Sequence, residues 1–396
     1  MVRVRIISLR LPEPEVRRVS EISAEAARCW NDITETANSF YLSHKKWMSK
    51  GDIQKAVKGG YALHSQTVQA LTDRFCGNRE TAARLRRNGD RKARYPYRTK
   101  RFVTIPFKKA AIRYDRDGEL ILTLAKGNRL RTGFVPEEGT VIRTAELVWN
   151  GAGNYNLHYT FGVPEPELLK NGLSAGIDIG EIHPVALVCE DGDGLIVSGR
   201  LIRSVKQWRN KVLAKLSKQI SRCEKGSRKF KKYVRAKARL RQKTDRQIRD
   251  MLHKATRMAA DFCSAKGIAE IVVGDLRGVE KNTRKKKRLG RKSRQKVSQM
   301  EYGKITSYLN YKAKERGISF VRKNERNTTK ECPGCGCHNI CAGRNYRCEK
   351  CGWEGHRDGK GAFMILRKKY PDTPLPEIGI FFRQVFPFFK KSIAGC

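Results

Sequence analysis

The chain has 396 residues, of which 84 are Lys or Arg and 39 are Asp or Glu, so its formal net charge is +45 at pH 7. This length predicts two or three domains with at least one large core, and the 39% hydrophobic share argues against a mainly disordered basic tail. The excess charge indicates a polyanionic partner, with nucleic acid as the strongest candidate. An anionic membrane surface is the rival, but no run approaches the roughly 18 apolar residues of a spanning helix and the N-terminus lacks a signal-peptide core. We therefore expect a cytoplasmic protein without a membrane partner.

The first part of the chain predicts strands on both sides of a helical segment. Apolar residues alternate with arginines over residues 2–10, which predicts a strand. A helical pattern then runs from about Glu15 to Leu85, and strand signals return over residues 102–163. This order predicts a small β-barrel that is interrupted by a helical lobe.

The second part predicts strands that alternate with helices, which is typical of an α/β domain. It begins near Gly176 with an apolar strand and a hairpin, and continues with one or two long basic helices over residues 201–265. A short buried strand (IAEIVVGDL), a helix, the strand SFVRKNE, a cysteine cluster and a final helix follow. The tail FFRQVFPFFKK is aromatic but too short to span a membrane, so we expect it to pack against a domain.

Two stretches concentrate the positive charge. Residues 203–249 carry 19 Lys or Arg and two acids, and residues 277–296 carry 11 with one acid. Such charge runs are often only solvated faces, but these exceed what solubility requires. Like charges at helical spacing repel one another, and a phosphate backbone would offset that cost. Both stretches are therefore predicted to bind nucleic acid.

Six of the twelve cysteines fall within twenty residues, in a pattern that predicts zinc. They are Cys332, Cys335, Cys337, Cys341, Cys348 and Cys351. Two CxxC knuckles separated by twelve residues favour a four-thiolate zinc ribbon, because each tight turn directs two sulfurs at one tetrahedral ion. The outer pairs, Cys332 with Cys335 and Cys348 with Cys351, are the predicted ligands. Cys337 and Cys341 could substitute for them. A closed site of this kind is structural and performs no chemistry.

Two acidic residues stand at informative places. Asp178 lies in GIDIG, at the start of an apolar strand, where a buried carboxylate is costly unless it is paired or bound to a metal. Asp358 lies in HRDGKGA, immediately before an apolar run. Taken singly, Asp178 could cap a turn and Asp358 could be a helix N-cap.

In chain order, GIDIG, IVVGDL, TTKECPGCG and YRCEKCGWEGHRDGKGA resemble the RuvC-type nucleases of the TnpB family. These are transposon-encoded, RNA-guided DNA endonucleases related to the compact type V CRISPR effectors. Upstream, HSQTVQALTDRF and ARYPYRTKRFVTIPF resemble the N-terminal lobe of the same family, so the resemblance covers nearly the whole chain. GIDIG alone is weak evidence, whereas the full set in this order is highly specific.

The resemblance implies an RNase-H-like domain in which three carboxylates hold two catalytic Mg²⁺ ions. Asp178 matches the first acid and Asp358 the third. The second is normally a Glu on the strand IVVGDL, where this chain has Gly274.

Two residues could supply the missing carboxylate. Asp275 is adjacent, but a shift of one residue turns a side chain to the opposite face unless the strand ends or bulges there. Glu325 ends a strand ahead of the zinc ribbon, and some family members resemble this chain both in losing the strand Glu and in having a Glu at this place. We predict Glu325 as the ligand, with an inactivated site as the alternative. Arg326 and Arg357 could orient the scissile phosphate, although surface salt bridges are the simpler role.

The fold expected on these grounds is α+β and multidomain: an N-terminal β-barrel with a helical insertion, then an RNase-H-like (RuvC) nuclease with an inserted zinc ribbon. The expected domains are a wedge-like barrel (1–14 and 100–170), a helical recognition lobe (15–99), the nuclease (171–325 and 356–370), the zinc ribbon (326–355) and a C-terminal tail (371–396).

The expected function is RNA-guided cleavage of DNA beside a short motif. Catalysis would use Asp178, Glu325 and Asp358 with two Mg²⁺ ions, and one structural Zn²⁺ would complete the fold. The expected partners are a guide RNA, target DNA and their heteroduplex, with the protein reading backbones and base pairing supplying sequence specificity. Three alternatives stay open: a nuclease-inactive RNA-guided DNA-binding protein, a compact type V CRISPR effector, and a general RNA- or DNA-binding protein without a guide.

Overall fold

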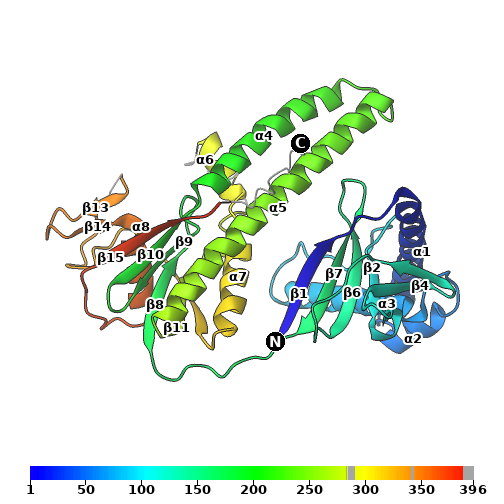
Figure 1. The fold of residues 1–396 in the computed structure, drawn as a ribbon, viewed down its shortest axis with the longest axis horizontal. Helices are drawn as coiled ribbons and strands as arrows, with labels where there is room; N and C mark the ends of the chain where they lie inside the picture. Colours follow the sequence, from blue (N-terminus) through cyan, green and yellow to red (C-terminus); the bar gives the residue numbers. More distant parts are fainter. Residues whose placement is uncertain (282, 284–289, 340–342, 387–396) are drawn as a thin grey trace. The chain divides into compact units, whose positions relative to one another are not determined.

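The computed structural model describes residues 1–281, 283, 290–339 and 343–386 (Figure 1). The chain divides into two compact units, Met1–Val163 and Pro164–Cys396. In the described residues, no helix is both long and apolar enough to cross a membrane.

The first unit is built from two antiparallel sheets and three helices. Its four-stranded sheet has the order β1-β7-β6-β2, and its three-stranded sheet the order β3-β4-β5. The strands are β1 (Val2–Ser8), β2 (Ile105–Lys108), β3 (Ile112–Tyr114), β4 (Leu120–Ala125), β5 (Asn128–Arg131), β6 (Ile142–Trp149) and β7 (Tyr155–Gly162). The helices are α1 (Glu13–His44), α2 (Lys50–Ala56) and α3 (Ser65–Arg87), with a single 3₁₀ turn, η1 (Lys109–Ala111). The predicted order of strand, helices and strands is confirmed, while closure of the strands into a barrel stays a prediction.

One hydrophobic core joins the sheets and helices of this unit. Trp30 of α1 and Phe75 of α3 meet edge to face, with ring centroids 6.1 Å apart, and both are buried. Phe107 of β2 and Tyr159 of β7 are buried in the same cluster. The alternation in β7, which buries Tyr155, Leu157 and Tyr159, therefore follows from one covered sheet face.

The second unit is centred on a six-stranded mixed sheet of order β12-β11-β8-β9-β10-β15. Its main strands are β8 (Leu173–Asp178), β9 (Val185–Cys189), β10 (Asp193–Ser198), β11 (Ile268–Gly274), β12 (Ser319–Lys323) and β15 (Gly379–Gln384). The helices are α4 (Arg200–Ser221), α5 (Arg228–Ala265), α6 (Arg291–Ser298), α7 (Tyr302–Lys314) and α8 (Arg357–Arg367). A small hairpin of β13 (Asn345–Arg347) and β14 (Glu354–His356) precedes α8.

Helices cover both faces of this sheet. Val273 of β11 packs in the core formed with α5 and α7, whereas its neighbour Val272 packs with Phe363 and Ile365 of α8. Successive residues of a strand point to opposite faces, so burial of both explains the continuous apolar run of β11. The predicted hairpin, basic helices, buried strand and final helix are all confirmed. The position of β15 is a finding that the sequence did not indicate: residues 379–384 add a parallel edge strand beside β10.

Helices α4 and α5 form a long basic hairpin (Figure 1). Its two helices are joined by an ion pair of 2.8 Å between Arg209 and Asp245. The only buried residue of α4 is Ile202, and the buried residues of α5 lie between Thr244 and Cys263. The first half of α5 and most of α4 therefore lie outside the core and present their cations to solvent.

Candidate active site and metal centre

Asp178 is the last residue of β8, at the beginning of the loop to β9, so the prediction that it lies at the start of the strand is wrong. An ideal Cβ placed on Gly361 of α8 would lie 2.9 Å from Asp178 Oδ2, so α8 packs directly against this carboxylate. Burial raises the pKa of Asp178 to about 7, and repulsion by Asp358 adds to the effect, against the hydrogen bond from the Ile179 backbone N–H. The carboxylate is thus held in a place that favours its neutral form unless a cation compensates.

Glu325 follows β12, which ends at Lys323 beside the end of β11. An ideal Cβ on Gly274 would lie 3.2 Å from Glu325 Cβ and would overlap the Glu325 carboxylate. Glu325 Oε2 is buried and accepts no hydrogen bond from the described residues. Burial raises the pKa of Glu325 to about 7, and the charges of Asp178 and Asp275 raise it further.

Asp358 is the second residue of α8, and its carboxylate is held by cationic or imidazole groups. Arg344 Nη1 donates to Oδ1 at 2.9 Å and to Oδ2 at 2.8 Å, and His183 Nδ1 lies 2.5 Å from Oδ2. Although burial acts in the opposite direction, these contacts hold the pKa of Asp358 below its usual value. The helix N-cap is His356, whose Nδ1 accepts from the Asp358 backbone N–H at 3.2 Å, so the N-cap alternative for Asp358 is wrong.

The three predicted acids therefore share one end of the sheet, with different surroundings. Asp178 is close enough to Asp358 and to Glu325 for each charge to raise the pKa of a neighbouring carboxylate. Among the described residues, the closest potential metal-binding group that includes an acid is His183, His356 and Asp358, whose ligand atoms all lie within 4.8 Å of one another. Asp178, Glu325 and Asp358 are not such a group, because their ligand atoms do not all lie within 4.8 Å of one another.

Sequence reasoning missed His183 and Arg344. His183 lies five residues after Asp178 in the β8–β9 loop, and Arg344 precedes β13. A polar residue shortly after GIDIG was the available signal for His183. Nothing local indicated Arg344, because only the fold brings it to Asp358.

Asp275 and the two candidate arginines have simple surroundings. β11 ends at Gly274, so Asp275 follows the strand. The rule that successive side chains of a strand point to opposite faces therefore does not fix the direction of the Asp275 side chain. Its carboxylate pairs with Arg277 at 2.5 Å, which holds its pKa below the usual value. Arg326 is exposed, while the charge of Arg357 lowers the pKa of Asp178. The roles predicted for both arginines stay predictions.

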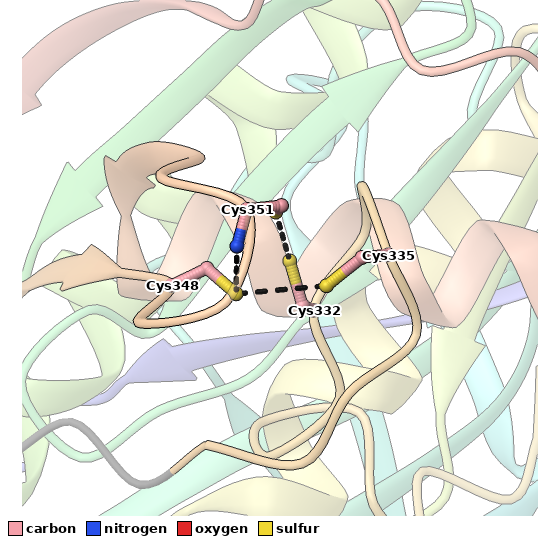
Figure 2. A group of neighbouring side chains, drawn as sticks. All are labelled: Cys332, Cys335, Cys348 and Cys351. Carbon is pink, nitrogen blue, oxygen red and sulfur yellow. Dashed lines mark hydrogen bonds between the residues drawn. The ribbon is translucent and has the colours of Figure 1, made fainter.

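Four cysteine sulfurs converge into a site with the geometry of a zinc ribbon (Figure 2). The ligand atoms of Cys332, Cys335, Cys348 and Cys351 all lie within 4.8 Å of one another. The Cys332–Cys351 and Cys335–Cys348 sulfurs are 3.6 Å apart, close to the roughly 3.8 Å edge of a tetrahedron with Zn–S bonds of about 2.3 Å. The backbone N–H of Cys351 donates to Cys348 Sγ and is the main cause that lowers the pKa of Cys348 to about 6, which favours the thiolate that zinc binds.

The two other cysteines of the cluster differ. Cys337 Sγ lies 3.2 Å from the sulfur of Cys335 and 3.3 Å from that of Cys348, so it borders the site as a fifth sulfur. Cys341, the other predicted substitute, lies outside the described residues.

Lys360 connects the cysteine segment to α8. Its side chain is fully buried, and its Nζ donates to the carbonyl oxygens of Thr329 at 3.0 Å and Glu331 at 2.9 Å. The ammonium also lies 3.8 Å from the ring centroid of Tyr346, in β13. The helix that carries Asp358 is thereby joined to the segment that carries the cysteines.

Parts of this chain match known protein families. A family model described as "Probable transposase" (OrfB_IS605) matches residues 158–280, and a "Cas12f1-like, TNB domain" model matches residues 302–365. A TnpB-like protein of Methanocaldococcus jannaschii is 27% identical over 124 residues, which is 31% of this chain and 43% of the relative. This chain thus aligns with less than half of the relative's length.

A solved structure shares the fold of this chain. The Cas12f1–sgRNA–target DNA complex is similar over 90% of this chain and 84% of that chain, with 14% identity and a TM-score of 0.62. The mini RNA-guided endonuclease CRISPR-Cas_phi3 aligns over 96% of this chain and 94% of that chain, with 11% identity and a TM-score of 0.47. The two family models and the TnpB-like relative each match a part of this chain, and the Cas12f1 complex shares its fold, so this chain is similar to TnpB-like proteins.

Proposed function

We propose that this protein is an RNA-guided DNA endonuclease that cleaves its target beside a short recognised motif. The observation that carries the proposal is the pair Asp178 and Glu325, whose pKa values are both raised to about 7. Two carboxylates that are costly to ionise where they stand are typical of a site built to hold cations. The buried Oε2 of Glu325, which has no hydrogen-bond partner in the described structure, supports the same conclusion.

The donor set fits Mg²⁺, which prefers oxygen ligands. Asp178, Glu325 and Asp358 would hold two ions, and these would supply activation of water and stabilisation of the leaving phosphodiester oxygen. His183 and Arg344 orient the Asp358 carboxylate through the contacts described above.

The remaining parts take proposed roles in binding nucleic acid. The exposed cations of the α4–α5 hairpin would contact the phosphates of guide RNA or heteroduplex. The wedge-like barrel and the helical lobe of residues 1–170 would bind the guide and the motif. Arg326 and Arg357 would orient the scissile phosphate, and the zinc ribbon would bind target nucleic acid beside the acids. A guide-dependent mode of binding is supported by the similar fold of Cas12f1, which was solved with sgRNA and target DNA.

Gly274 favours one alternative, an RNA-guided DNA-binding protein that does not cut, because the strand acid of the family is missing there. One experiment distinguishes the nuclease from the DNA-binding protein that does not cut. The RNA that co-purifies with the full-length chain is sequenced and used to design a matching DNA target flanked by randomised bases. We expect a discrete guide and Mg²⁺-dependent cleavage that a chelator stops. Guided binding without cleavage would favour the alternative, and equal binding of random-sequence RNA would contradict guided targeting.

A further inference from the structure

A cavity of about 490 Å³ lies in the second unit, between α4, α6, α7 and the loop after β8. Its volume falls within the roughly 300–1,000 Å³ of small-molecule sites. Gly180 and Glu181 form part of its lining, so it begins two residues beyond Asp178. None of the three acids lines it, which makes it a separate compartment beside the candidate active site.

One side of the cavity is apolar and rigid. Ile202 of α4, Leu252 of α5 and Ile305 of α7 are exposed by 6%, 1% and 3%. Pro184 of the β8–β9 loop completes this wall and is also buried. The face of an aromatic or heterocyclic ring packs favourably on such a surface.

An amide pair adds hydrogen-bonding groups to the lining. Asn210 Nδ2 donates to Gln299 Oε1 at 3.1 Å, and Gln299 Nε2 donates to Asn210 Oδ1 at 3.1 Å. Lys206 Nζ donates to the backbone oxygen of Gln299 at 2.6 Å, and burial lowers the pKa of Lys206. Side-chain amides offer one donor group and one acceptor each, which is the chemistry that recognises the edge of a nucleobase.

Cations outnumber carboxylates in the lining. Glu181 is paired with Arg203 at 3.6 Å, and Glu301 is paired with Lys304 at 2.8 Å. In the described part of the chain, no carboxylate lies within ion-pair distance of the other lining lysines. These are Lys206 and Lys211 of α4 and Lys292 and Lys296 of α6. The rim therefore carries uncompensated positive charge, which favours a phosphate.

We propose that this cavity binds one nucleotide, with its base against the apolar wall, its edge at the Asn210–Gln299 pair and its phosphate at the lysines of α4 and α6. The apolar wall and the lysines together favour a nucleotide, because a simple anion would need no apolar wall and a hydrophobic ligand would need no lysines. The nucleotide is either free or a unit of a single strand held beside Asp178. In the second case the inference deepens the proposed function and rests on it.

The first experiment measures binding without cleavage. Full-length protein freed of nucleic acid is titrated with AMP, CMP, ribose 5-phosphate and adenosine, followed by ligand-detected NMR and equilibrium dialysis. We expect saturable binding of one AMP or CMP per chain, and at least about tenfold weaker binding of the two ligands that lack base or phosphate. Equal affinity for ribose 5-phosphate would show an unspecific anion patch and overturn the proposal.

Matched variants locate the site. Ala214 of α4 lines the cavity and is exposed, so Ala214→Trp should block binding without disturbing the core. Gln219→Trp, on an exposed position of the same helix outside the lining, should bind as wild type. Unchanged binding by Ala214→Trp would overturn the assignment.

A second pair controls for general charge. The double variant Lys211→Glu/Lys292→Glu should weaken AMP binding by about tenfold or more, and Lys215→Glu/Lys218→Glu, with the same charge change outside the lining, should do so far less. Equal losses in both doubles would overturn the proposal. Asp178→Asn should bind AMP as wild type does, so failure of the nuclease proposal is distinguished from failure of this one.

A final comparison identifies the source of the nucleotide. If a strand supplies it, a short single-stranded oligodeoxynucleotide should lose affinity in Ala214→Trp, and an abasic unit in the oligonucleotide should remove that difference. If the nucleotide is free, AMP should bind in the presence of a saturating oligonucleotide. An oligonucleotide that displaces AMP yet binds Ala214→Trp as tightly as wild type would contradict both sources.

Discussion

The Glu325 side chain occupies the space that a side chain at Gly274 would need. An ideal Cβ at position 274 would lie 3.2 Å from Glu325 Cβ and 3.0 Å from Ile365 Cδ1, and would overlap the Glu325 carboxylate. The absence of a side chain at Gly274 on β11 therefore leaves the space that the Glu325 carboxylate, after β12, occupies. A carboxylate from the neighbouring strand end stands where a strand acid would project.

This overlap predicts a cost for the smallest possible side chain. Gly274→Ala should lower the free energy of unfolding by about 1–3 kcal/mol, because the added methyl group forces Glu325 or Ile365 to move. Urea denaturation measures the change. Gly303→Ala in α7, where nothing lies within 4 Å of the added Cβ, should be neutral or stabilising. Full stability of Gly274→Ala would contradict the steric account.

The pKa values of Asp178 and Glu325 predict how stability depends on pH. Both are raised to about 7, from ordinary values of 3.8 and 4.5, so the folded chain keeps protons that the unfolded chain has lost. Between those values the folded state binds more protons, and the free energy of unfolding therefore falls as pH rises, levelling off above about 7.

Urea denaturation in a chelator at about pH 5 and about pH 8 measures this fall. It should be smaller in Asp178→Asn and in Glu325→Gln, whose side chains do not ionise, and Mg²⁺ should reduce it in the wild type by stabilising the ionised carboxylates. Repulsion from the net charge of +45 is common to all three proteins, so the difference between them isolates the two acids. An equal fall in the variants would show that these acids are not the cause.

The cysteine geometry predicts one zinc ion per chain and a hierarchy among the sulfurs. Cys348→Ser should lose the ion and lower the melting temperature, since it belongs to the four sulfurs that converge. Cys337→Ser should retain it, because Cys337 borders the group without belonging to it. Elemental analysis of the purified variants measures both. Complete zinc loss in Cys337→Ser would require a different ligand set.

The buried Lys360 predicts that α8 and the cysteine segment depend on each other. Lys360→Met should lower the free energy of unfolding by about 2–4 kcal/mol, because the carbonyl oxygens of Thr329 and Glu331 lose a charged donor whose side chain is fully buried. It should also speed zinc release to a chelator. Lys368→Met, at the exposed end of the same helix, is the control and should leave both quantities unchanged. Normal zinc retention in Lys360→Met would show that the contact does not support the ribbon.

Local sequence patterns predicted most of the strands and helices, the elements that carry the three candidate acids, and the cysteine cluster. The apolar run before Asp178, the strand ahead of Glu325 and the apolar helix after Asp358 each follow from residues that are close in sequence. The two CxxC knuckles predicted the converging sulfurs for the same reason.

What could not be predicted depends on contacts between distant segments. Strand β15 pairs with β10, with Gly379 opposite Asp193, and an aromatic tail carries no signal for that partner. His183 and Arg344 meet Asp358 only because the β8–β9 loop and the segment before β13 fold over the start of α8. The close approach of the Glu325 side chain to Gly274 is visible only once β11 and β12 lie side by side.

We propose that Glu325 supplies the acid that is missing at Gly274, and that DNA cleavage depends on this replacement. The most direct test of this claim is guided DNA cleavage in Mg²⁺ by the wild type, Glu325→Gln and the double variant Gly274→Glu/Glu325→Gly, with target binding measured in parallel. We predict that the wild type cuts, that Glu325→Gln binds target equally but cuts at least about 100-fold more slowly, and that the double variant recovers part of the activity. Cleavage by Glu325→Gln at the wild-type rate would contradict the claim.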